Sequence, residues 1–137
     1  PMIVVDTNVL AYWFIRGDSR RAQLADSVVE INKEWYVPPI WASEFRNVLA
    51  TYMRFRQMRL GEARRFALSA EVFLASRIVG VASDDVLRLV DSSTCSAYDC
   101  EFVAAVKSLG VKLVTGDRKL AAAFPETVVT MEEFVQS

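Results

Sequence analysis

The chain contains no histidine among its 137 residues, and this absence excludes a wide range of chemistry. A Ser-His-Asp triad, a Cys-His pair, a histidine-based ribonuclease acid and base, and any histidine-containing zinc site cannot be built. Only two cysteines are present, Cys95 and Cys100, and without a second pair they cannot complete a tetrahedral structural zinc site. Carboxylates are the acid–base groups and metal ligands that remain.

Disulfide frameworks and long apolar runs are also missing. Two cysteines are too few for a disulfide framework, so a reducing compartment is the simpler expectation. The longest apolar run, residues 9–15, is far shorter than the roughly 20 residues of a membrane-spanning helix, and no basic leader precedes such a run. We therefore expect a soluble, cytoplasmic protein that does not associate with a membrane.

The composition is typical of one globular domain over residues 1–137. Hydrophobic residues make up 53% of the chain, which is enough for a substantial core. Short segments rich in Val and Ile alternate with helical patterns and lack polar alternation, which predicts a parallel sheet covered by helices on both faces. We expect a three-layer α/β/α sandwich, Rossmann-like, with five parallel strands. The expected strands are residues 3–5, 35–37, 78–82, 112–115 and 127–129, and the expected helices are residues 7–16, 19–34, 39–58, 62–77, 84–93, 97–109 and 118–124.

Four acidic residues occupy positions where a folded chain does not normally place a carboxylate. Asp6 and Asp117 each follow a short β-branched segment, so both are expected just past the carboxyl end of a strand, where open α/β sheets bind ligands. Glu44 and Asp99 fall inside helical patterns, on the stripe expected to face the core. If the fold brings all four together, they form a divalent-metal site made of oxygen ligands.

Each acid also has a structural explanation of its own. Asp6 and Asp117 are suited to capping the helices that follow them. Glu44 could pair with an arginine across a helix interface, and Asp99 stands three residues after Ser96 in a capping-box pattern. Four such coincidences in one chain favour a shared site.

The net charge of -1 is unevenly distributed, because arginines gather in residues 46–65. Arginine binds phosphate well through its planar fork, so this segment is a candidate phosphate-contacting surface. A pair of solvated helix faces is the alternative explanation. The segment holds a single acid, Glu62, and the arginines Arg46, Arg54, Arg56, Arg59, Arg64 and Arg65.

Four motifs together resemble the PIN domain, and among its members the VapC toxins of bacterial and archaeal toxin–antitoxin pairs. The likeness covers nearly the whole chain in order and spacing, and it is most specific over residues 96–120. The motifs are DTNVL at residues 6–10, SE at 43–44, SAYD at 96–99 followed by FVAA at 102–105, and LVTGDRKL at 113–120.

The resemblance implies an endoribonuclease that depends on Mg²⁺ or Mn²⁺. Carried over residue by residue, its catalytic acids fall on Asp6, Glu44, Asp99 and Asp117. We expect Asp6 and Asp99 to bind metal, Asp117 to bind a second metal or its waters, and Glu44 to orient ligands or the attacking water. Attack by water on phosphorus would leave a 5′-phosphate and a 3′-hydroxyl.

Further expectations follow from the same resemblance. Asn8 and Thr115 take the accessory amide and hydroxyl positions, and Gly116, where many relatives carry a bulkier residue, suggests a loose loop before Asp117. The expected partners are RNA, a VapB-like antitoxin and a second copy of the chain. RNA contacts are expected from Arg46, Arg54, Arg56 and Arg59, and antitoxin contacts from Trp41, Phe45 or Tyr52 if these are exposed.

Two other functions compete with this interpretation. A phosphatase of the haloacid dehalogenase type also begins with an aspartate after its first strand, but it requires a second acid where this chain has Asn8. A non-catalytic PIN-like interaction module is the other alternative, and such proteins typically lose one or more of the acids. All four acids are present here.

Overall fold

The computed structural model describes all residues, 1–137, and its centre is a parallel sheet of four short strands. The strands lie in the order β2-β1-β3-β4, and every neighbouring pair is parallel. The two central strands are buried along their whole length, which explains why they consist of Val, Ile and Leu apart from Thr115 at the end of β3. The strands are β1 (Ile3–Val5), β2 (Trp35–Tyr36), β3 (Leu113–Thr115) and β4 (Val128–Thr130).

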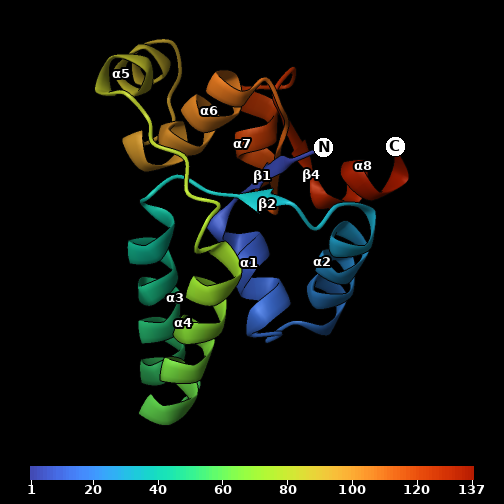
Figure 1. Ribbon diagram of the computed structural model, residues 1–137, viewed down its shortest axis with the longest axis vertical. Helices are drawn as coiled ribbons and strands as arrows, with labels where there is room; N and C mark the ends of the chain where they lie inside the picture. Colours follow the sequence, from blue (N-terminus) through green and yellow to red (C-terminus); the bar gives the residue numbers. More distant parts are fainter.

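Eight helices surround the sheet. In Figure 1 the strands lie in the middle of the molecule, with α1 to α4 on one side and α5 to α7 on the other, while α8 lies near α2. The expected three-layer α/β/α architecture is therefore confirmed. The helices are α1 (Thr7–Phe14), α2 (Ser19–Ile31), α3 (Trp41–Phe55), α4 (Leu60–Leu74), α5 (Ser83–Asp91), α6 (Ala97–Leu109), α7 (Arg118–Ala123) and α8 (Met131–Gln136).

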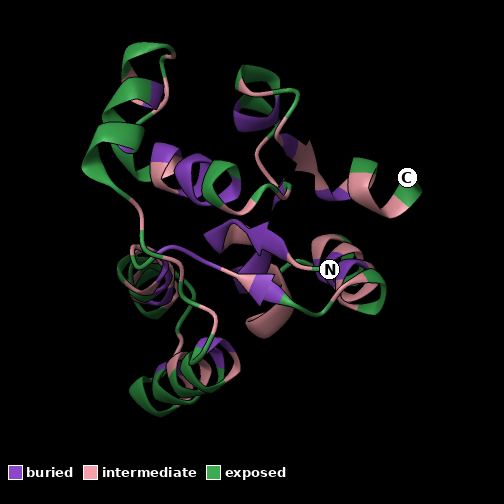
Figure 2. Cartoon of the chain, turned by 45° about the horizontal axis from the view of Figure 1, so that its top comes forward, coloured by how far each residue is buried: buried purple, intermediate pink, exposed green.

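The buried hydrophobic side chains form one continuous cluster of 29 residues between these layers. Figure 2 shows burial concentrated on the strands and on the inward sides of the helices, whereas the outward sides of α3, α4 and α5 are exposed. No helix is long and apolar enough to cross a membrane.

The expected fifth strand at residues 78–82 is wrong, because only Ile78 pairs with the sheet edge, in an isolated bridge to Val37. The Val37 N–H donates to the Arg77 carbonyl at 3.0 Å, and the Val79 N–H donates to the Val37 carbonyl at 2.8 Å. The next donor of a parallel ladder on this edge would be residue 39. Pro39 has no N–H, so pairing ends after one bridge.

Two helix ends also differ from expectation. Helix α8 was not expected, although Thr130 and Glu133 form the capping box that begins it. The helix expected over residues 39–58 ends earlier, at Phe55, and is followed by Gln57, whose φ of 60° is left-handed. Gly110 ends α6 in the left-handed conformation, with φ 68°, as expected of a C-terminal glycine.

The strand order fixes where a ligand can bind. The chain runs from β1 outward to β2 and then crosses back to β3 on the other side of β1. The connections therefore diverge between the carboxyl ends of β1 and β3, which leaves a crevice at the point where open α/β sheets bind ligands. Asp6 follows β1 at this point, and Gly116 and Asp117 follow β3.

Candidate active site

Asp6 is a buried carboxylate with both oxygens held in place. Its side chain is only 7% exposed, Oδ1 accepts the Thr7 N–H at 2.8 Å, and Oδ2 accepts the Thr115 hydroxyl at 2.7 Å. Burial is the main cause that raises the pKa of Asp6 to about 7, with smaller contributions from the charges of Glu44 and Asp99, and the two hydrogen bonds oppose the increase. Asp6 therefore caps α1, as its local sequence suggested, and also faces other acids.

Glu44, on α3, accepts a hydrogen bond from Thr7, the residue that follows Asp6. Its Oε1 accepts the Thr7 hydroxyl at 2.7 Å, so the partner of this half-buried acid is a threonine, and no arginine forms a salt bridge with it. Burial raises the pKa of Glu44, the Thr7 hydrogen bond opposes this effect, and the charge of Asp99 adds to it. Thr7, which sequence reasoning did not single out, thus links the end of β1 to α3.

Asp99 and Asp117 are the two half-buried acids on the other side. Asp99 lies in the first turn of α6, where its N–H donates to the Ser96 hydroxyl at 3.1 Å. Burial raises the pKa of Asp99, and the charge of Asp117 raises it further. Asp117 Oδ1 caps α7 by accepting the Lys119 N–H at 2.9 Å, which leaves Oδ2 without a hydrogen bond inside the chain.

The loop between β3 and Asp117 is held firmly, so the expectation of a loose loop at Gly116 is wrong. The Gly116 N–H donates to Asn8 Oδ1 at 3.0 Å, and the Asp117 N–H donates to the Thr115 hydroxyl at 3.0 Å. A Cβ atom at position 116 would lie 2.8 Å from Tyr12 Cε2, which is closer than real Cβ contacts allow. A larger residue here would therefore force the Tyr12 ring to move.

All four acids line one cleft with a volume of about 730 Å³. They come from four separate segments: the end of β1, helix α3, the start of α6 and the turn after β3. The cleft thus unites the residues that the sequence predicted as one site. Its lining consists of Asp6, Thr7, Asn8, Ile40, Ser43, Glu44, Asn47, Val48, Tyr98, Asp99 and Asp117.

The donor set of the cleft fits a hard divalent cation, although no three acids are already arranged to hold an ion. Every available ligand is an oxygen, because neither histidine nor cysteine lines the cleft. Each carboxylate oxygen that accepts one hydrogen bond keeps a second lone pair for a further partner. The raised pKa values of Asp6, Glu44 and Asp99 reflect burial and mutual repulsion, which a bound cation would relieve.

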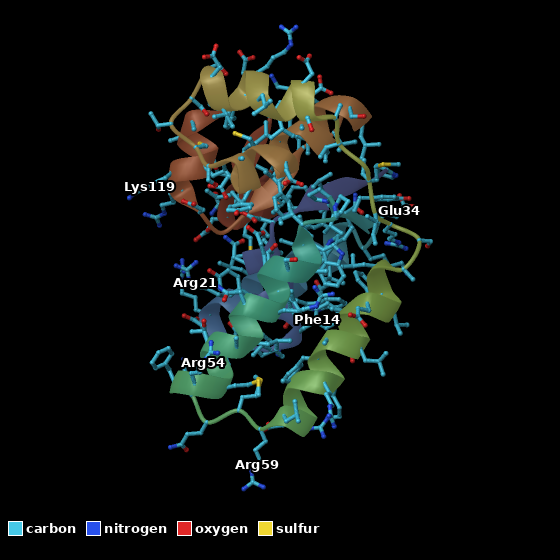
Figure 3. The ribbon with its side chains drawn as sticks, turned by 90° about the vertical axis from the view of Figure 1, so that its left-hand side faces the viewer. Phe14, Arg21, Glu34, Arg54, Arg59 and Lys119 are labelled. Carbon is cyan, nitrogen blue, oxygen red and sulfur yellow. The ribbon has the colours of Figure 1, made fainter.

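The arginines expected to contact RNA are exposed but lie outside the cleft. Arg46 is next to Asn47, which lines the cleft from α3. Arg54 lies near the end of α3, and Arg59 projects from the tip of the α3–α4 hairpin (Figure 3). The guanidinium of Arg56 stacks over the Tyr52 ring, 5.4 Å from its centroid. Whether these side chains bind RNA stays a prediction.

Antitoxin contacts from Trp41, Phe45 or Tyr52 were expected only if these side chains are exposed, and Trp41 and Phe45 do not meet this condition. Trp41 is 3% exposed and Phe45 is 1% exposed, because both pack into the core, and Tyr52 is half-buried. The exposed aromatic residue of this helix is Phe55 at its end. The acidic cleft has a different exposed aromatic residue at its edge, Tyr98, which precedes Asp99 on α6.

Comparison with known families identifies the domain. The PIN domain profile matches residues 3–124, which is most of the chain. Among curated proteins, the chain is 29% identical over 129 residues to ribonuclease VapC3 of Pyrobaculum aerophilum, a match that covers 92% of this chain and 97% of that protein.

Solved structures show the same fold at low sequence identity. PAE2754 from Pyrobaculum aerophilum superposes with a TM-score of 0.72 at 20% identity, over 98% of this chain and 94% of that one. A toxin–antitoxin complex from Klebsiella pneumoniae contains a chain that superposes with a TM-score of 0.68 at 18% identity, over 94% and 97% of the two chains. The overall fold is thus shared with these proteins.

Proposed function

The chain belongs to the PIN domain family, and we propose that it is a metal-dependent endoribonuclease that acts as the toxin of a toxin–antitoxin pair. The observation that carries this proposal is the convergence of Asp6, Glu44, Asp99 and Asp117, from four separate segments, on one cleft at the crevice between β1 and β3. Support also comes from the relatives, which include a ribonuclease and a toxin–antitoxin complex.

Mg²⁺ or Mn²⁺ is the proposed cofactor, and Asp6 and Asp99 are its proposed ligands. Asp117, whose Oδ2 has no hydrogen bond within the chain, would bind a second cation or its waters. When bound, a divalent cation supplies positive charge against the phosphodiester and lowers the pKa of the attacking water. The absence of histidine leaves the carboxylates as the groups that perform this chemistry.

Three polar residues that hydrogen-bond to the acids or to the turn before Asp117 have proposed positioning roles. The Thr7 hydroxyl fixes Glu44 Oε1, so that Oε2 can accept a hydrogen bond from the attacking water. The Thr115 hydroxyl fixes Asp6 and accepts the Asp117 N–H, which couples two acids through one side chain. Asn8 fixes Gly116 and thereby the turn that carries Asp117.

Incubation of the purified chain with mixed cellular RNA tests this function. In Mg²⁺ or Mn²⁺ we expect internal cleavage that leaves 5′-phosphate and 3′-hydroxyl ends, because water is the nucleophile and the ribose 2′-hydroxyl takes no part. EDTA should stop the reaction. Intact RNA under all metal conditions would favour the alternative of a non-catalytic PIN-like module.

Metal binding should also stabilise the fold. An ion that binds only the folded cleft raises the melting temperature by mass action, by an amount that grows with its concentration relative to Kd. We expect Mn²⁺ to raise the melting temperature of the unmodified chain and Asp6→Asn to blunt the increase, as measured by differential scanning fluorimetry. Equal increases in both proteins would mean that the ion binds elsewhere.

The exposed arginines are the proposed RNA-guiding surface. Replacing Arg54, Arg56 and Arg59 together by Gln should weaken RNA binding and lower the slope of log K against log salt by about 2, since each lost phosphate contact with a single strand removes about 0.7. Filter binding across a salt series measures this slope. Arg88→Gln on α5 is the control. If the triple variant shows the same slope as this control, the arginines do not contact RNA and these helix faces are only solvated.

The proposed partners are RNA, an antitoxin of the VapB type and a second copy of the chain. The antitoxin follows from the structural relatives, one of which was solved as a toxin–antitoxin complex. The proposed site of action is the cytoplasm, where the chain would meet its RNA substrate. A neighbouring short gene that encodes a DNA-binding antitoxin would support the pairing.

A further inference from the structure

The cleft contains a second set of side chains that the proposed cleavage chemistry does not use. Asp6, Thr7, Asn8, Glu44 and Asp117 are all tied by hydrogen bonds within the chain. In contrast, the Ser43 hydroxyl, the Asn47 amide and the Tyr98 hydroxyl line the same cleft and make no side-chain hydrogen bond inside it. Their hydrogen-bonding groups are therefore free for a ligand.

Tyr98 presents an aromatic ring beside the acids. It is 60% exposed, and it lies in the first turn of α6, one residue before Asp99. The hydrogen bond from the Asp99 N–H to the Ser96 hydroxyl fixes this turn. A ring held at the edge of a cleft can stack on a flat ligand without ordering a long side chain.

The opposite wall of the cleft comes from one face of α3. The residues of this face recur at helical spacing. Some are apolar, and the others carry groups that donate or accept hydrogen bonds. Asn47 is exposed, and its amide offers both a donor and an acceptor. The face consists of Ile40, Ser43, Glu44, Asn47 and Val48.

We propose that Tyr98 and Asn47 form a nucleobase subsite, in which Tyr98 stacks on the base beside the cleaved phosphate and Asn47 bonds to the edge of that base. The inference rests on the proposed nuclease function and assigns the residues that contact the base next to the cleaved bond. Bases in single strands are free to stack on aromatic side chains, whereas bases in a duplex are already stacked. An aromatic ring suits a base, because every base has a flat face on which the ring can stack, whereas the phosphate is proposed to lie at the cation.

A short RNA with one cleavage site tests the subsite, with a single base removed at successive positions to leave an abasic nucleotide. For the unmodified chain, removal of the base beside the cleaved bond should raise KM about tenfold or more, the size of effect that stacking on one aromatic residue produces. For Tyr98→Ala the intact RNA should already show this higher KM, and the abasic RNA should show no further increase. Tyr98→Phe keeps the ring and should behave as the unmodified chain.

Asn47→Ala provides a second readout that a purely structural role would not change. This variant should change which of the four bases is preferred at the position that stacks on Tyr98. Cleavage of four RNAs that differ only in that base measures the preference. Leu87→Ala on α5 is the matched control, because Leu87 is 61% exposed and lies outside the cleft.

The outcomes separate this inference from the nuclease proposal. RNA binding measured by fluorescence anisotropy in EDTA requires no cleavage, and Tyr98→Ala should weaken it where Leu87→Ala does not. Failure of the unmodified chain to cleave RNA would overturn the nuclease function. Normal KM and normal binding for Tyr98→Ala, or equal abasic effects in Tyr98→Ala and the unmodified chain, would overturn the nucleobase subsite.

Discussion

Replacing Asp6 by asparagine should lower RNA cleavage about a thousandfold or more, because the charge that holds the cation is lost and with it several kcal/mol of transition-state stabilisation. The amide keeps the shape of the carboxylate, its carbonyl can accept the Thr7 N–H, and the Thr115 hydroxyl can accept its N–H. Asp99→Asn should have a similar effect. Initial rates on a defined RNA in Mn²⁺ measure both.

Asp91→Asn is the control for these variants, because Asp91 is an exposed acid at the end of α5, away from the cleft. It should cleave RNA at the rate of the unmodified chain. All three variants should keep the circular dichroism spectrum of the folded protein. Cleavage at unmodified rates by both Asp6→Asn and Asp99→Asn would remove these residues from the mechanism.

The second large effect is on stability without metal, and it depends on pH through Asp6. Its pKa is about 7 in the folded chain and 3.8 as the reference value for the unfolded chain. Between these values the folded chain keeps a proton that the unfolded chain loses, so the unfolding free energy falls as pH rises from about 4 and the loss is complete above about 7. The fall should reach a few kcal/mol, since one pKa unit corresponds to about 1.4 kcal/mol.

Asp6→Asn isolates this contribution, because the amide does not titrate. In EDTA the variant should melt at nearly the temperature of the unmodified chain at pH 4 and several degrees higher at pH 8. Thermal unfolding followed by circular dichroism at both pH values measures the difference. If the difference in melting temperature between the two proteins does not change with pH, the surroundings of Asp6 do not raise its pKa towards 7.

Much of the site could be predicted from the sequence because the end of a strand can be recognised from the few residues around it. Asp6 and Asp117 follow short β-branched segments, and parallel strands place their carboxyl ends at one edge of a sheet. Glu44 and Asp99 were expected on inward faces of helices, and both are half-buried on the cleft. Their common location required the resemblance to the PIN domain, since helix spacing alone does not say which element a face meets.

The features that the sequence did not reveal depend on contacts between distant residues. The Thr7 hydroxyl meets Glu44 across 37 residues, and Tyr12 closes over Gly116 across more than a hundred. The missing fifth strand depends on Pro39, whose effect appears only when residues 78–82 are placed beside it. The sequence left open whether Trp41 and Phe45 are exposed, because an amphipathic pattern does not specify which stripe another helix covers.

The central claim is that the acids of this cleft hold the cation on which RNA cleavage depends. Anomalous X-ray diffraction from crystals of the chain grown in Mn²⁺ tests it most directly, because the signal locates the ion itself. We predict an anomalous peak in the cleft beside the carboxylates of Asp6 and Asp99, and no peak there in crystals of Asp6→Asn. A cleft without Mn²⁺ in the unmodified chain, at a concentration that supports cleavage, would contradict the claim.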